Sequence, residues 1–413
     1  MKKGIVIVLC FFLCFYCFGF YESYANSGLK IHYIDVGSGD AIYIEADGET
    51  MLIDGGFLSQ SDKSDDITTR TPLEHQIHHD KQAPLQESHS HFLQDFRELL
   101  TKYNNSDVTQ YLDRLGVKNI DYIVSTHPHF DHLGGLLQVI NKYTYQHVYY
   151  NGREYHTSYY KYFKMLVDDN VKLGKTATGL EIPQQNDTFR LGQAKVTILS
   201  DQTKDYSTIS GDGDETNNSS LVIRLDYGER SFLFTGDIQV TGQRQLIENY
   251  PQLLSNINVL KIPHHGHTNN DFQVWEHSGN YAFFNQVQPV LSLISCGTNN
   301  TSVTIPTNKV KNDLSMSDIY TTKDLGTVVL SCDGSHISIQ YQTSFIHAFV
   351  KGDINGDGKV TPADYVLIRR QILNTYHLKG NGKWCADING DGKITPADYV
   401  LARRHILGTY QIN

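Results

Sequence analysis

Ser125-Thr-His-Pro-His-Phe-Asp-His-Leu-Gly-Gly135 places three histidines and an aspartate within six residues. The apolar run Tyr122–Val124 before it predicts a short buried strand, so we expect the cluster to lie on a loop at the strand's end. Histidines two residues apart cannot share one face of a helix, which also favours a loop. Imidazole and carboxylate groups at this density are typical of metal ligands. A solvated histidine-rich turn that binds metal only by accident is the alternative, which the ordered spacing disfavours.

Two later motifs, Phe234-Thr-Gly-Asp237 and Ile262-Pro-His-His-Gly266, follow this cluster along the chain. Together with the cluster they resemble the metallo-β-lactamase superfamily of hydrolases. The stretches Ile34–Ala41, Met51–Gly56 and Asn218–Gly228 resemble the extracellular hydrolase domain of ComEC-type competence proteins and their secreted relatives. This resemblance runs from about residue 30 to residue 342 and implies an α/β fold, the αββα sandwich of the superfamily, over residues 29–345.

The resemblance also implies a pair of zinc ions, or of another divalent transition metal, held by nitrogen and oxygen ligands. One ion would be held by the first two histidines of the cluster, and the other by the aspartate, the third histidine and a later histidine. An aspartate at the end of the expected strand Ser231–Thr235 would bridge the two ions. Such a pair lowers the pKa of a shared water toward roughly 7. The implied zinc ligands are His127, His129, Asp131, His132, Asp237 and His265.

Further roles follow for residues beside the ligands. Asp131 would also orient the attacking water as a base. Neighbouring residues in extended backbone point to opposite sides, so we expect only His265 of the His264-His265 pair to face the metals. His264 is then expected to hydrogen-bond the developing anion of the substrate. The resemblance implies that Asp54 braces the metal loop, and we expect Asn218 to support the site.

The sequence departs from the family pattern at two places. The common third histidine of the first metal site has no evident match, although Asn217, Asn218 and Asp201 are near enough in sequence to substitute for it. The segment Cys296–Pro306 also lacks the Gly-His-Pro motif of the ComEC-like domain. These departures leave a degenerate, non-catalytic metal-binding module as the alternative function.

The N-terminus has the pattern of a secretory signal peptide over residues 1–25. Met1-Lys-Lys3 is basic, Gly4–Phe20 is apolar, and Ser23-Tyr-Ala25 suits cleavage after the alanine. We therefore expect a secreted, extracellular protein with no membrane span after cleavage; a retained membrane anchor is the alternative. A disulfide between Cys296 and Cys332 is conceivable in an oxidising exterior and would leave Cys385 unpaired.

Hydrophobic patterning predicts the elements around the cluster. A polar insertion over about residues 57–110 carries five histidines, and we expect a solvated loop ending in a helix at Phe92–Tyr103 rather than a flap over the substrate. The tyrosine-rich segment 143–162 is expected to fill a contact between sheet and helix rather than to stack on substrates. The expected strands are Leu29–Asp35, Ala41–Glu45, Thr50–Ile53, Lys195–Ser200, Ser219–Leu225 and Ser231–Thr235.

The C-terminal residues 350–413 form a separate calcium-binding module. Residues 353–376 recur at 387–410 with 20 identities in 24 positions, each copy opening on Asp-Ile-Asn-Gly-Asp-Gly. Oxygen ligands at loop positions 1, 3, 5 and 12, with glycine at position 6, suit a flexible cage for Ca²⁺. A loop followed by one helix, present twice, resembles the type I dockerin domain, a small all-α module that implies a cohesin domain of a scaffold or cell-surface protein as partner. The expected ligands of two Ca²⁺ ions, in loops 353–364 and 387–398, are Asp353, Asn355, Asp357, Lys359, Asp364, Asp387, Asn389, Asp391, Lys393 and Asp398.

The charge distribution bears on the substrate. The chain has a net charge of −10, of which residues 1–25 carry +1 and residues 350–413 carry +3, so the body between them carries −14. An acidic body repels polyanions at long range, which leaves nucleic acid as a possible substrate and disfavours tight non-specific binding. We therefore expect a secreted, dockerin-tethered hydrolase of phosphoesters; within enzymes, an esterase for cell-wall phosphorylcholine and a nuclease are both open.

Overall fold

The structure is a computed structural model, and the predicted signal peptide and most of the polar insertion lie outside the residues that it describes. The described residues are 28–58, 89–102, 106–204, 215–267, 280–297, 305–342, 351–354, 360–376, 378, 385–391 and 393–412.

The first of two sheets has the strand order β15-β14-β1-β2-β3-β4-β5-β6 among the described residues. The meander predicted for the N-terminal strands is present as antiparallel β1, β2 and β3, and β3, β4 and β5 then pair in parallel. The strands are β1 (Leu29–Tyr33), β2 (Ile42–Ala46), β3 (Glu49–Ile53), β4 (Asn119–Ser125), β5 (Thr144–Tyr150), β6 (Leu180–Glu181), β14 (Thr327–Cys332) and β15 (Ile337–Gln342).

The second sheet has the order β13-β12-β11-β10-β9-β8-β7 over the same described part of the chain. Strands β10, β11, β12 and β13 run parallel, so their carboxyl ends meet at one edge. The strands are β7 (Thr188–Leu191), β8 (Ala194–Ile198), β9 (Ile223–Tyr227), β10 (Arg230–Phe234), β11 (Val259–Lys261), β12 (Leu291–Ile294) and β13 (Asp318–Thr321).

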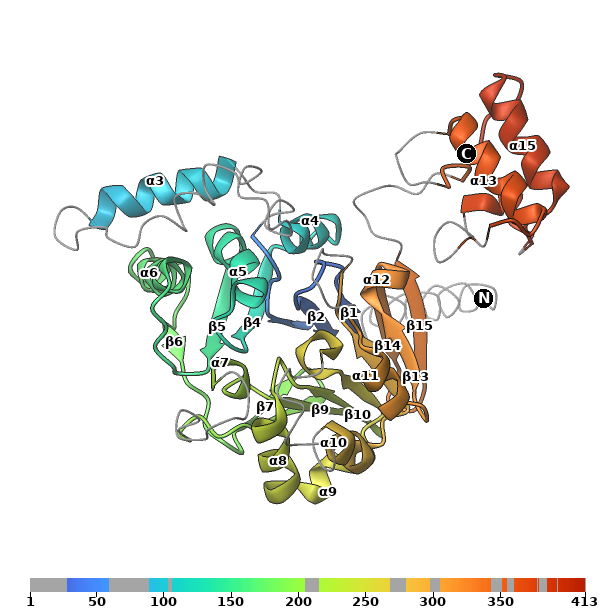
Figure 1. Ribbon diagram of the computed structural model, residues 1–413. Coiled ribbons are helices and arrows are strands. Elements are labelled where there is room, and N and C mark those ends of the chain that lie inside the picture. Colours follow the sequence, from blue (N-terminus) through green and yellow to red (C-terminus); the bar gives the residue numbers. More distant parts are fainter. Residues whose placement is uncertain are drawn as a thin grey trace, which may run out of the picture.

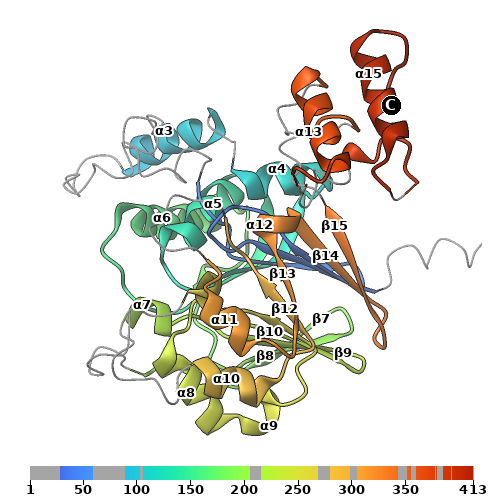
Figure 2. The ribbon, with the colours of Figure 1, turned by 45° about the vertical axis from the view of Figure 1, so that its right-hand side comes forward.

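Helices cover the outer face of each sheet (Figures 1 and 2). The first sheet is covered by α3 (His89–Lys102), α4 (Asp107–Arg114), α5 (Phe130–Lys142) and α6 (Ser158–Lys172). The second is covered by α8 (Val240–Asn249), α9 (Pro251–Leu254), α10 (Asn280–Val287) and α11 (Asn308–Asp313). Short helices at α7 (Glu215–Asn218), η3 (Pro263–Gly266) and α12 (Thr322–Leu325) lie in the connections.

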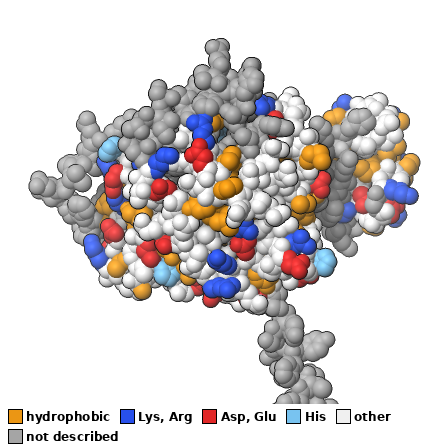
Figure 3. Space-filling view, turned by 90° about the horizontal axis from the view of Figure 1, so that it is seen from below, with side chains coloured by type: hydrophobic (Ala, Val, Ile, Leu, Met, Phe, Trp, Pro, Cys, Tyr) orange, Lys and Arg blue, Asp and Glu red, His pale blue; other side chains and the backbone are white. Residues whose placement is uncertain are grey.

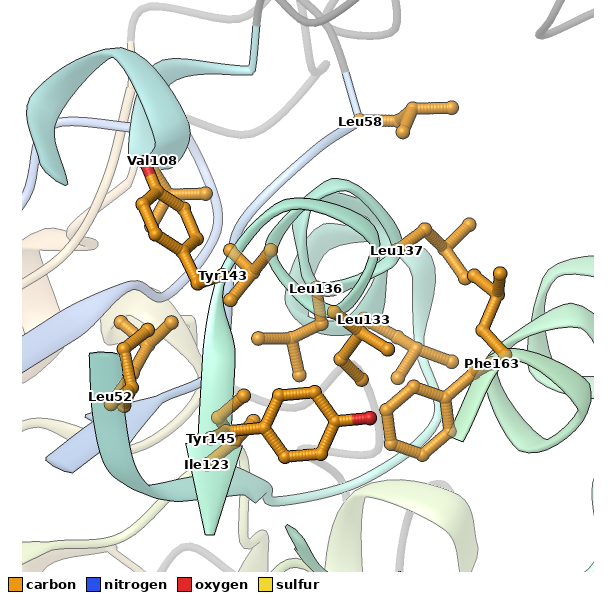
Figure 4. Packing of buried hydrophobic residues seen from close by; sticks show 14 of the residues in the cluster. Leu52, Leu58, Val108, Ile123, Leu133, Leu136, Leu137, Tyr143, Tyr145 and Phe163 are labelled. Atoms are coloured by element: carbon orange, nitrogen blue, oxygen red, sulfur yellow. The ribbon is translucent and has the colours of Figure 1, made fainter. Parts of the chain in front are cut away.

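Three hydrophobic clusters hold these layers together. Between the sheets, side chains such as Ile44 and Met51 pack with Val196 and Phe232 from the other sheet. A second cluster joins the first sheet to its helices: Figure 4 shows the leucines of α5 packed against residues of the sheet and of α6, including Phe163. A third joins the second sheet to α8, α9, α10 and α11. The helix, sheet, sheet, helix order confirms the predicted αββα sandwich.

The tyrosine-rich segment fills the contact between the first sheet and its helices, as predicted. Tyr143, Tyr145, Tyr160 and Tyr162 are each at most 5% exposed. Asn170 on α6 donates to the hydroxyl of Tyr145 at 2.8 Å, which satisfies a polar tip inside this contact. These rings therefore stabilise the fold, and Tyr155, whose ring centroid is 6.0 Å from that of His129, is the one that contacts the histidine cluster among the described rings.

Some predicted boundaries were wrong. The histidine cluster is only partly a loop, because α5 begins at Phe130 and takes Asp131 and His132 into its first turn, where a carboxylate is favourable to the helix dipole. The strand predicted from Ser219 begins only at Ile223, because the amide of Ser220 closes the preceding turn by donating to the carbonyl of Asn217 at 3.1 Å. The conceivable disulfide is also absent, since Cys296 and Cys332 are free thiols, as is Cys385.

The C-terminal module contains the two predicted helices, α13 (Pro362–Ile372) and α15 (Pro396–Ile406), each with proline in its first turn. Thr361 and Thr395 cap them, and the aspartate three residues later completes a capping box in each. The helices pack through a small core of their own that includes Ile368 and Ala402. No helix among the described residues is long and apolar enough to cross a membrane.

Candidate functional site

Three strands, one of the first sheet and two of the second, precede the candidate metal ligands. Strand β4 ends at Ser125 and is followed by the histidine cluster, which opens α5. Strand β10 ends at Phe234, two residues before Gly236, and Asp237 follows directly. The segment η3, which carries His265, comes after β11, the parallel neighbour of β10. The ligands therefore converge where the ends of these strands meet between the two sheets.

Four of the six predicted zinc ligands form one compact cluster: Asp131, His132, Asp237 and His265 each offer an atom within 4.8 Å of the others. The Nε2 atoms of His132 and His265 are 3.3 Å apart. Each of them is 3.1 Å from Oδ2 of Asp237. Oδ2 of Asp131 is 3.3 Å from Nε2 of His265 and 3.8 Å from Nε2 of His132. All four groups thus face a common point.

The other two predicted ligands lie beside this cluster. Nε2 of His127 is 3.1 Å from Nδ1 of His129. The ring of His127 lies with its centroid 4.2 Å from that of His132. The two histidines predicted for a separate first site are therefore adjacent to each other and to the four-residue cluster.

The histidines are oriented by partners on their outward nitrogens. Nδ1 of His132 donates to Oδ2 of Asp54 at 2.8 Å, and Nδ1 of His265 donates to the carbonyl of Ser295 at 2.9 Å. The hydroxyl of Thr126 donates to Asp54, so its oxygen accepts from Nδ1 of His127 at 3.0 Å. This leaves Nε2 of each ring as the free acceptor, which is the arrangement typical of metal-binding histidines. The donor set therefore fits a divalent metal such as zinc.

The pKa shifts of the cluster residues also support a metal site. Burial would lower the pKa of both His132 and His265, but the carboxylate of Asp237, with Asp131, raises it well above its usual value, to about 10 for His265. Burial alone would raise the pKa values of Asp131 and Asp237. The neighbouring His132 and His265 more than offset this effect, so both pKa values are lowered. His127 differs, since burial and the neighbouring His132 lower its pKa. The two carboxylates therefore favour positive charge at the point that the four ligands face, as a cation site requires.

The extended backbone assumed for His264 and His265 was wrong, and the choice of His265 as the metal ligand stays a prediction. The backbone there is not extended: both residues have left-handed φ values, 49° and 53°, in a short turn that begins at Pro263. Their rings nevertheless diverge, His265 into the cluster and His264 toward Gln239, whose amide donates to Nδ1 of His264 at 3.3 Å. Nε2 of His264 therefore carries a proton that it can donate.

Two of the residues considered as substitutes for the missing third histidine are used elsewhere, whereas Oδ1 of the third, the buried Asn217, has no hydrogen-bond partner among the described residues. Oδ1 of Asn218 accepts from the amides of Gln239 and Gly242 at the start of α8, at 2.9 and 3.0 Å. Asp201 accepts from the amide and hydroxyl of Thr203. Among the described residues, it is instead the hydroxyl of Ser220 that approaches this site, 3.3 Å from Nδ1 of His127. Asn218 thus supports the helix behind Asp237 rather than a metal ligand directly.

Two buried charged residues behind the cluster were not predicted from the sequence. Lys261, the last residue of β11, contacts Asp40 and lies 3.3 Å from Oδ1 of Asp237. Asp40 follows the Gly37-Ser-Gly39 turn after β1 and is 1% exposed. A charged residue in the buried parallel strand before Ile262-Pro-His-His was the available signal, because a lysine is rarely buried without a partner.

The second calcium loop is described, whereas Asn355, Asp357 and Lys359 of the first loop lie outside the described residues. Oδ1 of Asp398 accepts from the amides of Ile388 and Asn389 at 2.8 and 3.1 Å. The amide of Asp391 donates to Oδ1 of Asp387, and the amide of Lys393 donates to Asp391. In the first loop, Asp353 and Asp364 are fully buried, and Oδ1 of Asp364 accepts from the amide of Ile354 at 2.8 Å, as in the second loop. The last carboxylate of each loop, Asp364 or Asp398, thus makes the same contact in both repeats.

Comparisons with known proteins agree with this geometry. The family model of the metallo-beta-lactamase superfamily matches residues 34–255, and that of the dockerin type I domain matches residues 351–407. ComE operon protein 3 of Bacillus subtilis is 23% identical over 285 residues, which cover 66% of this chain and 29% of that protein. The chain therefore spans less than a third of that relative's length.

Two solved structures are similar to different parts of the chain. The metallo-beta-lactamase fold protein YhfI of Bacillus subtilis is 12% identical, with a TM-score of 0.39, over 72% of this chain and 98% of that one. A dockerin of ScaB, in complex with the third cohesin of ScaC from Acetivibrio cellulolyticus, is 36% identical, with a TM-score of 0.15, over 16% of this chain and 90% of that one. With the fold and the ligand cluster described above, the family matches show that this chain belongs to the metallo-beta-lactamase superfamily and carries a C-terminal type I dockerin domain.

Proposed function

We propose that this chain is a secreted, zinc-dependent hydrolase of phosphodiesters, held by its dockerin to a cohesin-bearing scaffold or surface protein. The convergence of Asp131, His132, Asp237 and His265 on one point is the observation that carries the proposal. It is supported by the family membership and by the oriented Nε2 atoms, because three inward-facing imidazoles and two carboxylates are a donor set suited to zinc.

The residues divide between two metal positions. His127 and His129 would hold one ion, and Asp131, His132 and His265 the other. Asp237 would be a further ligand through its Oδ2, because its Oδ1 faces Lys261. Bound zinc ions would supply a water of lowered pKa and stabilise negative charge on the phosphoryl oxygens.

The protein's own groups would position the substrate and move its protons. The carboxylate of Asp131, with its side chain 28% exposed, is the most accessible of the four ligands and can accept a hydrogen bond from the attacking water. His264 is oriented by Gln239 with a proton on Nε2, so it can donate a hydrogen bond to the anion that develops in the transition state. Burial, together with the neighbouring His265, lowers the pKa of His264, so it would act as a neutral donor.

Small or zwitterionic phosphodiesters are the favoured substrates. The body of the chain carries a net charge of −14, and on the face shown in Figure 3 the Lys and Arg side chains are interspersed with Asp and Glu rather than gathered in a basic groove. Duplex DNA binding depends on several simultaneous phosphate contacts with basic side chains. A phosphorylcholine ester needs no such groove.

A substrate panel tests this proposal. The mature chain, prepared without metal and then loaded with zinc, would be given bis-p-nitrophenyl phosphate, p-nitrophenyl phosphorylcholine and supercoiled plasmid. We expect turnover of the small diesters that a chelator abolishes, with slower plasmid cleavage. Efficient plasmid degradation, with DNA binding that falls steeply with salt, would restore the nuclease interpretation.

The second candidate is a metal-binding module without catalysis. It is favoured by the engagement of Asn218 and Asp201 elsewhere, which leaves Asn217, of the three substitutes considered, to complete the site of His127 and His129. A zinc content below two ions per chain, together with no turnover of any diester, would support this candidate.

A further inference from the structure

The ligands of the candidate metal cluster come from both halves of the sandwich. Asp131 and His132 lie at the start of α5, after strand β4 of the first sheet. Asp237 and His265 follow β10 and β11 of the second sheet. Their spacing, 3.1 Å between Asp237 Oδ2 and each imidazole Nε2, therefore depends on how the two sheets are held together at this edge.

One buried ion pair joins the sheets at this point. The side chain of Lys261, at the end of β11, is 0% exposed. Its ammonium group donates to the carbonyl of Gly236 at 2.8 Å, contacts the carboxylate of Asp40 and lies 3.3 Å from Oδ1 of Asp237. These three acceptors match the three hydrogens of an ammonium group. Two of them belong to the Gly236-Asp237 turn, so Lys261 fixes the turn that presents a ligand.

Asp40 connects this lysine to the other half of the cluster. Its backbone amide donates to the carbonyl of Asp131 at 3.3 Å. Its carboxylate lies 3.8 Å from Nδ1 of His132 and 3.7 Å from Nδ1 of His265. The residue before it, Gly39, makes the approach possible, because a Cβ there would lie 2.2 Å from the carbonyl oxygen of Asp131. Asp40 thus contacts the histidine cluster through its backbone, at Asp131, and the second sheet through its side chain, at Lys261.

We propose that Asp40 and Lys261 form a positioning link across the two sheets that sets the distance between the two halves of the metal centre. Lys261 binds Oδ1 of Asp237 and leaves only Oδ2 directed at the metal position. Asp40 holds Lys261 while its own backbone holds Asp131. The inference rests on the metal site of the proposed function and is independent of the substrate.

A stabilising role without any effect on the metal is the competing explanation, because an unpaired buried charge is costly wherever it occurs. The double variant Asp40→Asn/Lys261→Met distinguishes the positioning role from a purely stabilising role. It removes one charge of each sign, so the net charge near the metal is unchanged and no buried charge of the pair is left alone. A loss of zinc affinity in this variant therefore reports positioning rather than long-range electrostatics.

The matched control is a second ion pair of the same domain. Nη2 of Arg97 on α3 lies 2.8 Å from Oδ2 of Asp169 on α6. The variant Arg97→Met/Asp169→Asn makes the same chemical change away from the cluster. Asp40→Asn alone is a milder third variant, since its amide oxygen still accepts from Lys261.

The experiment measures zinc affinity by competition with a chromophoric chelator, and melting temperature in the chelator alone. We expect zinc affinity to fall about 10- to 100-fold in the double variant, the range typical of lost partners of metal ligands, and about 10-fold in Asp40→Asn. Lys261→Met alone should melt at a lower temperature than the double variant, because it leaves both carboxylates unpaired. The control variant Arg97→Met/Asp169→Asn should melt at a lower temperature than the wild-type chain and keep the wild-type zinc affinity.

The outcomes distinguish the link from the proposed function. Wild-type zinc affinity in both Asp40→Asn and the double variant, or an equal loss of affinity in the control, would overturn the link and leave the proposed function intact. Failure of the wild-type chain to bind zinc would overturn both. If the double variant does not fold, Asp40→Asn alone decides between the two explanations by the same affinity measurement.

Discussion

Each buried histidine of the cluster has its Nδ1 engaged by a different kind of acceptor. His132 donates to a carboxylate, His265 to a backbone carbonyl and His127 to the hydroxyl of Thr126. A carboxylate partner raises the basicity of the ring most, because it carries a full charge. His132 is therefore the ligand whose strength depends most on its partner.

Replacement of Asp54 by asparagine tests this dependence. Asp54→Asn keeps the size of the side chain and removes the charge that His132 and Thr126 contact. We expect zinc affinity to fall by about 10- to 100-fold. Equilibrium dialysis checks it, with Asp121→Asn as the matched control, because the carboxylate of Asp121 on β4 also accepts a hydrogen bond from a backbone amide, that of Thr50. Unchanged affinity in Asp54→Asn would contradict the bracing role.

Loss of a ligand should be more severe than loss of its partner. In Asp237→Asn, the Oδ2 position that faces both His132 and His265 no longer carries a charge. We expect kcat to fall by at least about 100-fold, with an unchanged far-UV circular dichroism spectrum. His147→Ala, which changes a histidine on β5 that pairs with Glu181, is a control for general damage. Comparable activity in the two variants would argue against Asp237 as a ligand.

At the scale of elements, the site depends on close approaches between backbone segments. The β1–β2 turn meets the metal loop at Gly39, and β3 is followed by Asp54, whose φ of 57° turns its carboxylate back toward the cluster. Left-handed backbone is costly for a residue with a side chain and persists where surrounding contacts hold it. The elements that carry no ligand thus contribute by fixing those that do.

Gly39→Ala should disturb this packing. The added Cβ would lie 2.2 Å from the carbonyl oxygen of Asp131, so the turn or the metal loop must move. We expect a destabilisation of about 1–3 kcal/mol and weaker zinc binding. Gly179→Ala is the control, because its Cβ would meet nothing within 4 Å. Thermal melting and zinc titration of both variants check the result, and equal behaviour would contradict the proposed close contact.

These examples show what the sequence could and could not predict. The dense histidine cluster and the repeated Asp-Ile-Asn-Gly-Asp-Gly loops are local patterns whose chemistry can be read directly, and the β1–β3 meander follows from alternation. The Asp40–Lys261 contact joins residues more than 200 positions apart, so no local pattern indicates it. The turn at His264 and His265 was also missed, because their left-handed backbone is set by neighbouring segments rather than by residue preference.

At the scale of the whole molecule, the chain combines two parts with opposite charge and separate cores. The acidic body carries −14 and residues 350–413 carry +3. The C-terminal core includes Ile368 and Ala402, which differ between the repeats but are fully buried, so the outer faces of α13 and α15 are more alike than the sequences suggest. The guanidinium group of Arg370 lies over the ring of Tyr376, and that of Arg404 lies over the ring of Tyr410 in the same way. We expect the two parts to bind their metals independently.

Calcium should order the C-terminal part without changing zinc affinity. Each loop crowds like charges, Asp353 and Asp364 in the first and Asp387, Asp391 and Asp398 in the second, and a bound cation removes that cost. We therefore expect calcium to protect residues 350–413 from limited proteolysis in the full chain, whereas zinc alone should not. Asp398→Asn should require more calcium for the same protection. Full protection in the absence of calcium would contradict this prediction.

The central claim is that the histidine and aspartate cluster is a metal centre that hydrolyses phosphodiesters, and one titration tests it most directly. Zinc would be added stepwise to the metal-free full chain while bound zinc and the hydrolysis of bis-p-nitrophenyl phosphate are measured on the same samples. Turnover should rise with bound zinc, saturate near two ions per chain and disappear in Asp237→Asn. Saturation with zinc without turnover of this diester, or turnover that persists when a chelator has removed the zinc, would contradict the claim.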